Sequence, residues 1–217
     1  MEIARKVFII IYLITMVNYF FSETSGNFKR RAINKILLAS MFLLFSIYGF
    51  IYNQTEINIF LLIAIIFSFL GDVLLLFSFN VGGIAFIIGN ICFSIYLLVI
   101  YYNRGLLLWP FIFLFGIFYG FYLYLLKSGY LNLGNKKIFS LYMASIVAHG
   151  CLGLLLTLHN IFAVHSVLGC GLTLFMLSDF FLASHYFHDK NNKWILISNS
   201  GCYFTGMMLV ALYVGMI

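Results

Sequence analysis

The chain has 217 residues, of which 64% are hydrophobic, 20% aromatic and only 8% charged. Such a composition cannot provide the polar surface of a soluble globular protein, so the chain must be solvated by lipid. The formal net charge of +6 is therefore interpreted as a topology signal and as attraction to anionic membrane lipids. A nucleic-acid partner is not expected.

Interruptions by charged residues, Asn and Gly divide the sequence into eight mainly apolar stretches. A helix needs roughly 20 apolar residues to cross a bilayer, and a helix satisfies all its backbone polar groups internally. The alternation typical of a membrane barrel is absent from the sequence. We therefore expect an all-α polytopic membrane protein, a single transmembrane domain over residues 1–217. The predicted spans are 7–21, 33–52, 57–79, 82–102, 105–126, 138–158, 160–183 and 194–216.

The first span follows Arg5 and Lys6, as a signal peptide would, but the segment YFFSETSG after it offers no small-residue cleavage site. We expect a retained helix, so that eight spans place both termini on one side of the membrane. The positive-inside rule then puts the termini outside and the more basic face in the cytoplasm, in the plasma (inner) membrane of a bacterium. Nine of the twelve Lys and Arg residues lie on this basic face: Lys29, Arg30, Arg31, Lys35, Lys127, Lys136, Lys137, Lys190 and Lys193.

Two of the six acidic residues, Asp72 and Asp179, lie inside strongly apolar stretches. An ionisable group in the hydrocarbon layer costs at least about 2.5 kcal/mol, which makes such a residue a candidate for function. Both aspartates lie toward the C-terminal ends of their spans, about 10 Å and about 6 Å from the ends at 1.5 Å per residue. They therefore approach the basic face.

The sequences around the two aspartates resemble each other, FLGDVLL at 69–75 and MLSDFFL at 176–182. The aspartates are 107 residues apart, close to half the chain, and lie on spans of the same direction. This pattern predicts a parallel repeat of four plus four spans, with halves of about 1–104 and 105–217. Such a repeat would bring the two carboxyls together across a pseudo-two-fold axis.

Two neighbouring carboxyls in a medium of low dielectric constant cannot easily both ionise, so one stays protonated while the other is a carboxylate. One can then donate a proton while the other stabilises a cation or orients water, as in the cleavage of acetal-like bonds. Buried acids can also merely lock helices together, or form the proton path of a small proton-coupled transporter. Polar residues concentrate toward one face, which argues mildly against a path across the membrane.

The segments SFLGDVLL (68–75), GIAF (83–86) and LSDFFLA (177–183) resemble the paired signatures of the YhhN family. The resemblance covers about residues 30 to 215, and Lys35 and Tyr142 also fall at family positions. It implies a membrane enzyme of about eight helices, a lysoplasmalogenase. Such an enzyme hydrolyses the vinyl ether of lysoplasmalogen, a lysophospholipid, to a fatty aldehyde and glycerophosphoethanolamine or glycerophosphocholine. The chain departs from the family pattern at Ile36 (Pro), Asn90 (His), Phe93 (Tyr), His149 (Met) and Gly206 (Gln), with the usual residue in parentheses.

The expected catalytic residues are Asp72, desolvated by its neighbours and acting as the acid, and Asp179, beside Ser178, as the ionised partner. Lys35 is expected to contact the lipid headgroup, or alternatively to be an ordinary snorkelling anchor. Asn90 and His149 could orient substrate or relay a proton, or serve as interhelical hydrogen bonder and core histidine. The other expected substrate-binding residues are Ser68, Tyr142, Ser178 and Tyr203.

We expect no cofactor and no metal. The segment His185–Asp189 has metal-like spacing, but it lies beside Lys190 and Lys193 and is interpreted as an interfacial loop. The four cysteines contain no C-x-x-C pair, and apolar packing is their expected role.

Overall fold

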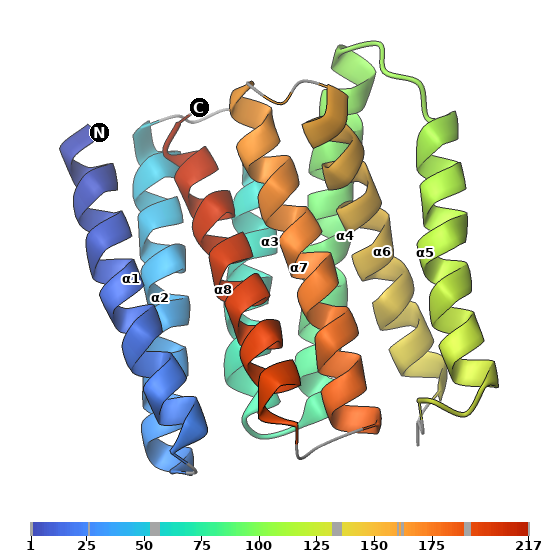
Figure 1. The fold of residues 1–217 in the computed structure, drawn as a ribbon. Coiled ribbons are helices and arrows are strands. Elements are labelled where there is room, and N and C mark those ends of the chain that lie inside the picture. Colours follow the sequence, from blue (N-terminus) through green and yellow to red (C-terminus); the bar gives the residue numbers. More distant parts are fainter. Residues whose placement is uncertain are drawn as a thin grey trace.

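The computed structural model describes residues 2–25, 27–52, 57–131, 136–159, 161, 163–188 and 192–216. Within these residues the chain forms eight α-helices and no strand (Figure 1). Each helix is long and apolar enough to cross a membrane, so the prediction of an all-α, multi-pass membrane protein is confirmed. The helices are α1 (Glu2–Thr24), α2 (Phe28–Tyr52), α3 (Asn58–Leu75), α4 (Phe79–Asn103), α5 (Trp109–Lys127), α6 (Lys136–His159), α7 (Val164–Phe187) and α8 (Lys193–Val214).

The connection between α3 and α4 lies earlier in the chain than the sequence indicated. The third span was predicted to end at residue 79, whereas α3 ends at Leu75 and Ser78 is already extended, with φ −153° and ψ 123°. The turn is made of Leu76, Phe77 and Ser78 and therefore contains none of the charged, Asn or Gly residues by which the spans were divided. Phe77 is 82% exposed at the end of the bundle, where an aromatic side chain suits the membrane interface.

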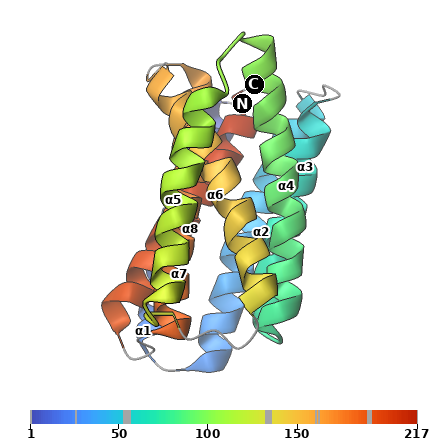
Figure 2. The same cartoon turned by 90° about the vertical axis from the view of Figure 1, so that its right-hand side faces the viewer.

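Six helices form a closed ring in which each packs against the next: α2, α3, α4, α6, α7 and α8, with α8 returning to α2. The helix α1 lies outside the ring against α2 and α8, and α5 lies outside it against α6 (Figures 1 and 2). Both termini lie at one end of the bundle (Figure 1). The interior of the ring can therefore hold a site that is screened from lipid on all sides.

The order of packing is similar in the two halves of the chain. In a four-plus-four repeat, α1 to α4 would correspond to α5 to α8. The contact of α2 with α3 then corresponds to that of α6 with α7, and the contact of α1 with α2 corresponds to that of α5 with α6. The contact of α1 with α8 has no counterpart between α5 and α4 among the described helices. The four-plus-four repeat stays a prediction with which this packing agrees.

The helices α7 and α8 approach closely at a pair of glycines. A Cβ atom on Gly206 would lie 2.6 Å from the carbonyl oxygen of Gly171, and one on Gly171 would lie 2.7 Å from the carbonyl oxygen of Gly206. Because backbone atoms cannot move aside without moving the helix, a side chain at either position would separate α7 from α8. This contact gives a physical reason for Gly206 in this chain.

Candidate functional site

Asp72 and Asp179 lie in the interior of the ring, toward the end of the bundle opposite the termini. Their side chains are 2% and 3% exposed. Together with Lys35, Tyr142 and Tyr203 they line a cavity of about 30 Å³, which we call the inner cavity. The structure thus brings the two sequence motifs to one place, although α3 and α7 do not pack directly against each other in the described part of the chain.

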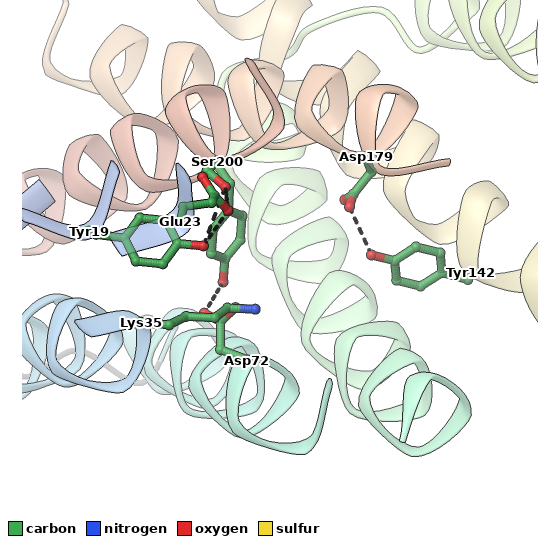
Figure 3. Close-up of polar contacts among 8 residues, drawn as sticks. Tyr19, Glu23, Lys35, Asp72, Tyr142, Asp179 and Ser200 are labelled. Carbon is green, nitrogen blue, oxygen red and sulfur yellow. Dashed lines mark hydrogen bonds and ion pairs between the residues drawn. The ribbon is translucent and has the colours of Figure 1, made fainter. Parts of the chain in front are cut away.

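Asp72 has a partner on each of its carboxyl oxygens. The ammonium group of Lys35, from α2, lies 3.1 Å from Oδ1, and the hydroxyl of Tyr203, from α8, donates a hydrogen bond of 2.6 Å to Oδ2. An adjacent cation and a charge-assisted hydrogen bond both favour the ionised form of a carboxyl group. Lys35, expected as a headgroup contact, is therefore in the first place the counter-ion of Asp72 (Figure 3).

Asp179 has a different set of partners. The hydroxyl of Tyr142, from α6, donates a hydrogen bond of 2.9 Å to Oδ1 (Figure 3). The other oxygen, Oδ2, is buried and has no hydrogen-bond partner among the described residues, and no ion pair of the described chain includes this aspartate. A buried carboxyl without a counter-ion avoids a large desolvation cost when it is protonated. The two aspartates are therefore chemically unlike.

Aromatic rings enclose the inner cavity. The ring of Phe86, from α4, lies between the two tyrosines, 6.3 Å from the ring of Tyr142 and 6.2 Å from that of Tyr203. The residue before Asp72 is a glycine, and a Cβ atom on Gly71 would lie 2.6 Å from the Phe86 ring. The absence of a side chain at Gly71 thus lets Phe86 pack against α3 beside the carboxyl.

A larger cavity of about 210 Å³ adjoins the inner cavity at the basic end of the bundle. We call it the vestibule. Lys35, Asn199 and Tyr203 line both spaces, so the two cavities are direct neighbours. Arg31 and the 56% exposed Phe28 also line the vestibule, which therefore reaches the surface of the protein.

Sequence reasoning missed a third buried acid, Glu23, which lines the vestibule. The first span was predicted to end at residue 21, but α1 continues to Thr24 and leaves Glu23 only 7% exposed. Its Oε1 accepts hydrogen bonds of 2.7 Å from Tyr19 and of 2.7 Å from Ser200 (Figure 3). The available signal was the spacing of Tyr19 and Glu23, since residues four apart lie on the same face of a helix.

The N-terminus of α8 is fixed by a side-chain cap. Asn192 accepts hydrogen bonds from the backbone N–H groups of Trp194 and Ile195. Such a cap satisfies N–H groups that the first turn of a helix leaves without partners. It defines the register from which Ser200 and Tyr203 project toward the two cavities.

Two expected site residues bond to their own helices. The hydroxyl of Ser68 donates to the carbonyl oxygen of Ala64 at 2.9 Å, and that of Ser178 donates to the carbonyl oxygen of Phe175 at 2.7 Å. Neither serine lines the inner cavity. Both hydroxyl groups are thus engaged within their own helices, α3 and α7, next to the aspartates.

Asn90 and His149, also expected at the site, lie deeper in the bundle. Both are fully buried, and the amide of Asn90 donates a hydrogen bond of 3.1 Å to Ser145. His149 follows Tyr142 by two turns of α6 and packs 5.3 Å from the ring of Phe175, which lines the inner cavity. The Phe175 ring thus lies between His149 and the inner cavity, and neither Asn90 nor His149 lines that cavity.

The segment with metal-like spacing falls partly outside the described residues, because Asp189 is not described. Its first residue, His185, lines the vestibule. In the part of the chain that the structure describes, no group of three or more His, Cys, Asp or Glu residues could hold a metal ion.

The fold and the site define a class of protein: a multi-pass helical membrane protein with two buried, unequal carboxyls on one cavity. The chain belongs to the YhhN family, whose model matches residues 30–214. No curated protein and no solved structure matches the chain. The family match begins inside α2, so α1 with Tyr19 and Glu23 lies outside the matched part.

Proposed function

We propose that this YhhN-family protein hydrolyses the vinyl ether bond of a lysoplasmalogen to a fatty aldehyde and glycerophosphoethanolamine or glycerophosphocholine. The observation that carries the proposal is the unequal environment of two carboxyls on one cavity. Asp72 faces an ammonium group at 3.1 Å, whereas Oδ2 of Asp179 has no partner in the described chain. An acid on this cavity can protonate the vinyl ether, and an anion on the same cavity can stabilise the cation that forms.

In the first step Asp179, protonated, donates its proton to the β-carbon of the vinyl ether. The electron pair of the C=C bond forms the new C–H bond, and the α-carbon becomes part of an oxocarbenium ion. The carboxylate of Asp72 stabilises this cation. These roles reverse the ones expected from sequence, because the ion pair with Lys35 favours ionised Asp72.

In the second step a water molecule adds to the oxocarbenium carbon and gives up a proton to Asp179, which is thereby restored. The resulting hemiacetal breaks its bond to the glycerol oxygen, which takes the hydroxyl proton, and an aldehyde leaves. One water is consumed in each cycle. Proton transfer by a positioned acid or base is typically worth about 10² to 10⁴ in rate.

The cavities suit this substrate. The inner cavity of about 30 Å³ has room for a water molecule, which needs about 10–15 Å³. The vestibule carries Arg31 and Lys35 at its wall, and such cations bind phosphate. A headgroup in the vestibule would place the vinyl ether near the carboxyls, with the alkenyl chain among the apolar helices.

The test is aldehyde release by the purified protein from lysoplasmalogen and, in parallel, from its saturated ether analogue. We expect aldehyde from the vinyl ether alone, and its loss in Asp72→Asn and Asp179→Asn. Glu2→Gln, an acid-to-amide change at an exposed ion pair with Lys6, is the control. Failure of folded wild-type protein to release aldehyde would exclude the proposed reaction.

A second candidate is a small proton-coupled transporter. The observation that favours it is the series of buried polar side chains beyond the site, where Ser145 contacts Asn90 and His149 lies deeper still. Against it, Phe93 and Phe175 pack on His149 at ring distances of 5.7 Å and 5.3 Å. Proton uptake into vesicles that contain the protein, driven by a solute gradient, would support transport.

A further inference from the structure

Glu23 is a buried acid that the proposed reaction does not use. It lies in α1, and its side chain lines the vestibule. Only Oε1 is engaged, by the hydroxyls of Tyr19 and Ser200, while Oε2 is buried and has no hydrogen-bond partner among the described residues. Unlike Asp179, Glu23 shares its cavity wall with two cations, Arg31 and Lys35, which favour the carboxylate form. A buried carboxylate oxygen without a donor is unfavourable, so this oxygen can accept a hydrogen bond from a ligand.

The two hydroxyl groups hold the carboxyl from two helices. Tyr19 precedes Glu23 by one turn of α1, and Ser200 reaches it from α8 (Figure 3). Ser200 links α8 to Oε1, and Tyr12 of α1 donates a further hydrogen bond of 2.9 Å to the carbonyl oxygen of Phe204 in α8, so neither contact between the two helices uses Oε2. A purely structural carboxyl would be expected to engage both of its oxygens, which leaves Oε2 without a structural role.

The vestibule carries charges of both signs. Arg31 and Lys35 line it together with Glu23. A ligand with a phosphate and an ammonium group a few atoms apart complements this arrangement. The phosphate would face the two basic side chains, and the ammonium group would face Glu23.

The kind of ammonium group follows from the hydrogen-bonding chemistry. A primary ammonium group has three N–H donors, as in a lysine side chain, and can satisfy a carboxylate oxygen directly. A quaternary ammonium group has no N–H and is recognised instead by aromatic faces. The free Oε2 therefore favours the primary amine.

We propose that Glu23 binds the primary ammonium group of a phosphoethanolamine headgroup in the vestibule and selects it over phosphocholine and phosphoglycerol. The inference rests on the proposed lipid substrate and adds a specificity-determining residue on α1. That helix lies outside the part of the chain matched by the family.

The test is equilibrium binding of saturated ether lysolipids, which cannot be cleaved as vinyl ethers, to the full-length protein in detergent. The three lipids differ only in their headgroup: phosphoethanolamine, phosphocholine or phosphoglycerol. We expect the first to bind most tightly, and Glu23→Gln to reduce its preference over the other two about tenfold. The matched control Glu2→Gln, on the same helix and exposed, should keep the preference.

A second, milder variant tests the inference in case Glu23→Gln does not fold. Ser200→Ala keeps the carboxyl charge but removes one hydrogen bond from Oε1, so we expect a smaller loss of preference, about threefold. Equal binding of the three lipids by the wild type, or an equal loss for all three in Glu23→Gln, would overturn the inference. Aldehyde release, measured separately, distinguishes this outcome from failure of the proposed reaction: headgroup preference without aldehyde supports the Glu23 site and rejects the hydrolase.

Discussion

The ammonium group of Lys35 lies 3.1 Å from Asp72, the residue 37 positions later in the chain. Tyr142 has the same spacing of 37 residues to Asp179, to which it donates a hydrogen bond of 2.9 Å. The predicted halves of the molecule thus present the same contact with different chemistry, a cation in one and a phenol in the other. The difference gives two matched carboxyls unlike environments, which is the basis of the proposed acid and carboxylate roles.

Removal of the Lys35 charge should lower both the stability of the protein and its turnover. Lys35→Met leaves the Asp72 carboxylate buried without its counter-ion, and breaking one side of a buried ion pair typically costs about 3–5 kcal/mol. We expect a lower unfolding temperature in detergent and a fall in turnover of about 100-fold. Lys29→Met, exposed at the start of the same helix, should change the unfolding temperature little.

The double variant Lys35→Met/Asp72→Asn tests the coupling of this pair. It removes both charges, so the unfolding temperature should recover toward the wild-type value while turnover remains lost. Additive losses of stability in the double variant would contradict a direct interaction between the two side chains.

The hydroxyl of Tyr142 positions Asp179. We expect Tyr142→Phe to lower kcat about tenfold with little change in KM, because the ring stays in place while the carboxyl loses its one hydrogen bond within the described chain. Steady-state aldehyde release measures both constants. Tyr102→Phe, at a side chain that is 86% exposed, is the control. A change in KM alone would indicate substrate binding instead.

The contact of Gly171 with Gly206 should be sensitive to one added methyl group. Gly206→Ala places a Cβ atom against the carbonyl oxygen of Gly171, and relief requires α7 and α8 to move apart. We expect a loss of about 1–3 kcal/mol, as for other overpacked sites, seen as a lower unfolding temperature. Gly116→Ala on α5, where a Cβ atom would meet nothing within 4 Å, should be neutral or stabilising. Equal effects of the two changes would contradict the close helix contact.

The orientation of the bundle remains a prediction from charge. Both termini should lie outside the cytoplasm, which places the vestibule on the cytoplasmic side. Alkaline phosphatase fused to the C-terminus folds only outside the cytoplasm of a bacterium, and should therefore be active. Fluorescence of a C-terminal green fluorescent protein would instead indicate the reverse orientation.

Much of the architecture could be predicted because the insertion of a helix into a membrane depends mainly on the residues of that helix. The length of each apolar stretch decides whether it can span, and all eight predicted spans correspond to helices. The turn at 76–78 was misplaced because it contains no charged residue, Asn or Gly to mark it. Asp72 and Asp179 were visible for the same local reason, as rare acids in apolar surroundings.

The sequence by itself determined the helical class, the number of spans and the two aspartates, since lipid solvation makes length and polarity decisive. Only the tertiary structure decided which groups meet these carboxyls. Lys35 could have been a snorkelling anchor until α2 was seen to pack beside α3 and place its ammonium group against Asp72. Glu23 could have lain in the interface until the docking of α1 against α8 buried it. Such pairings depend on how helices far apart in the chain rotate and pack, which the hydrophobicity of each segment does not specify.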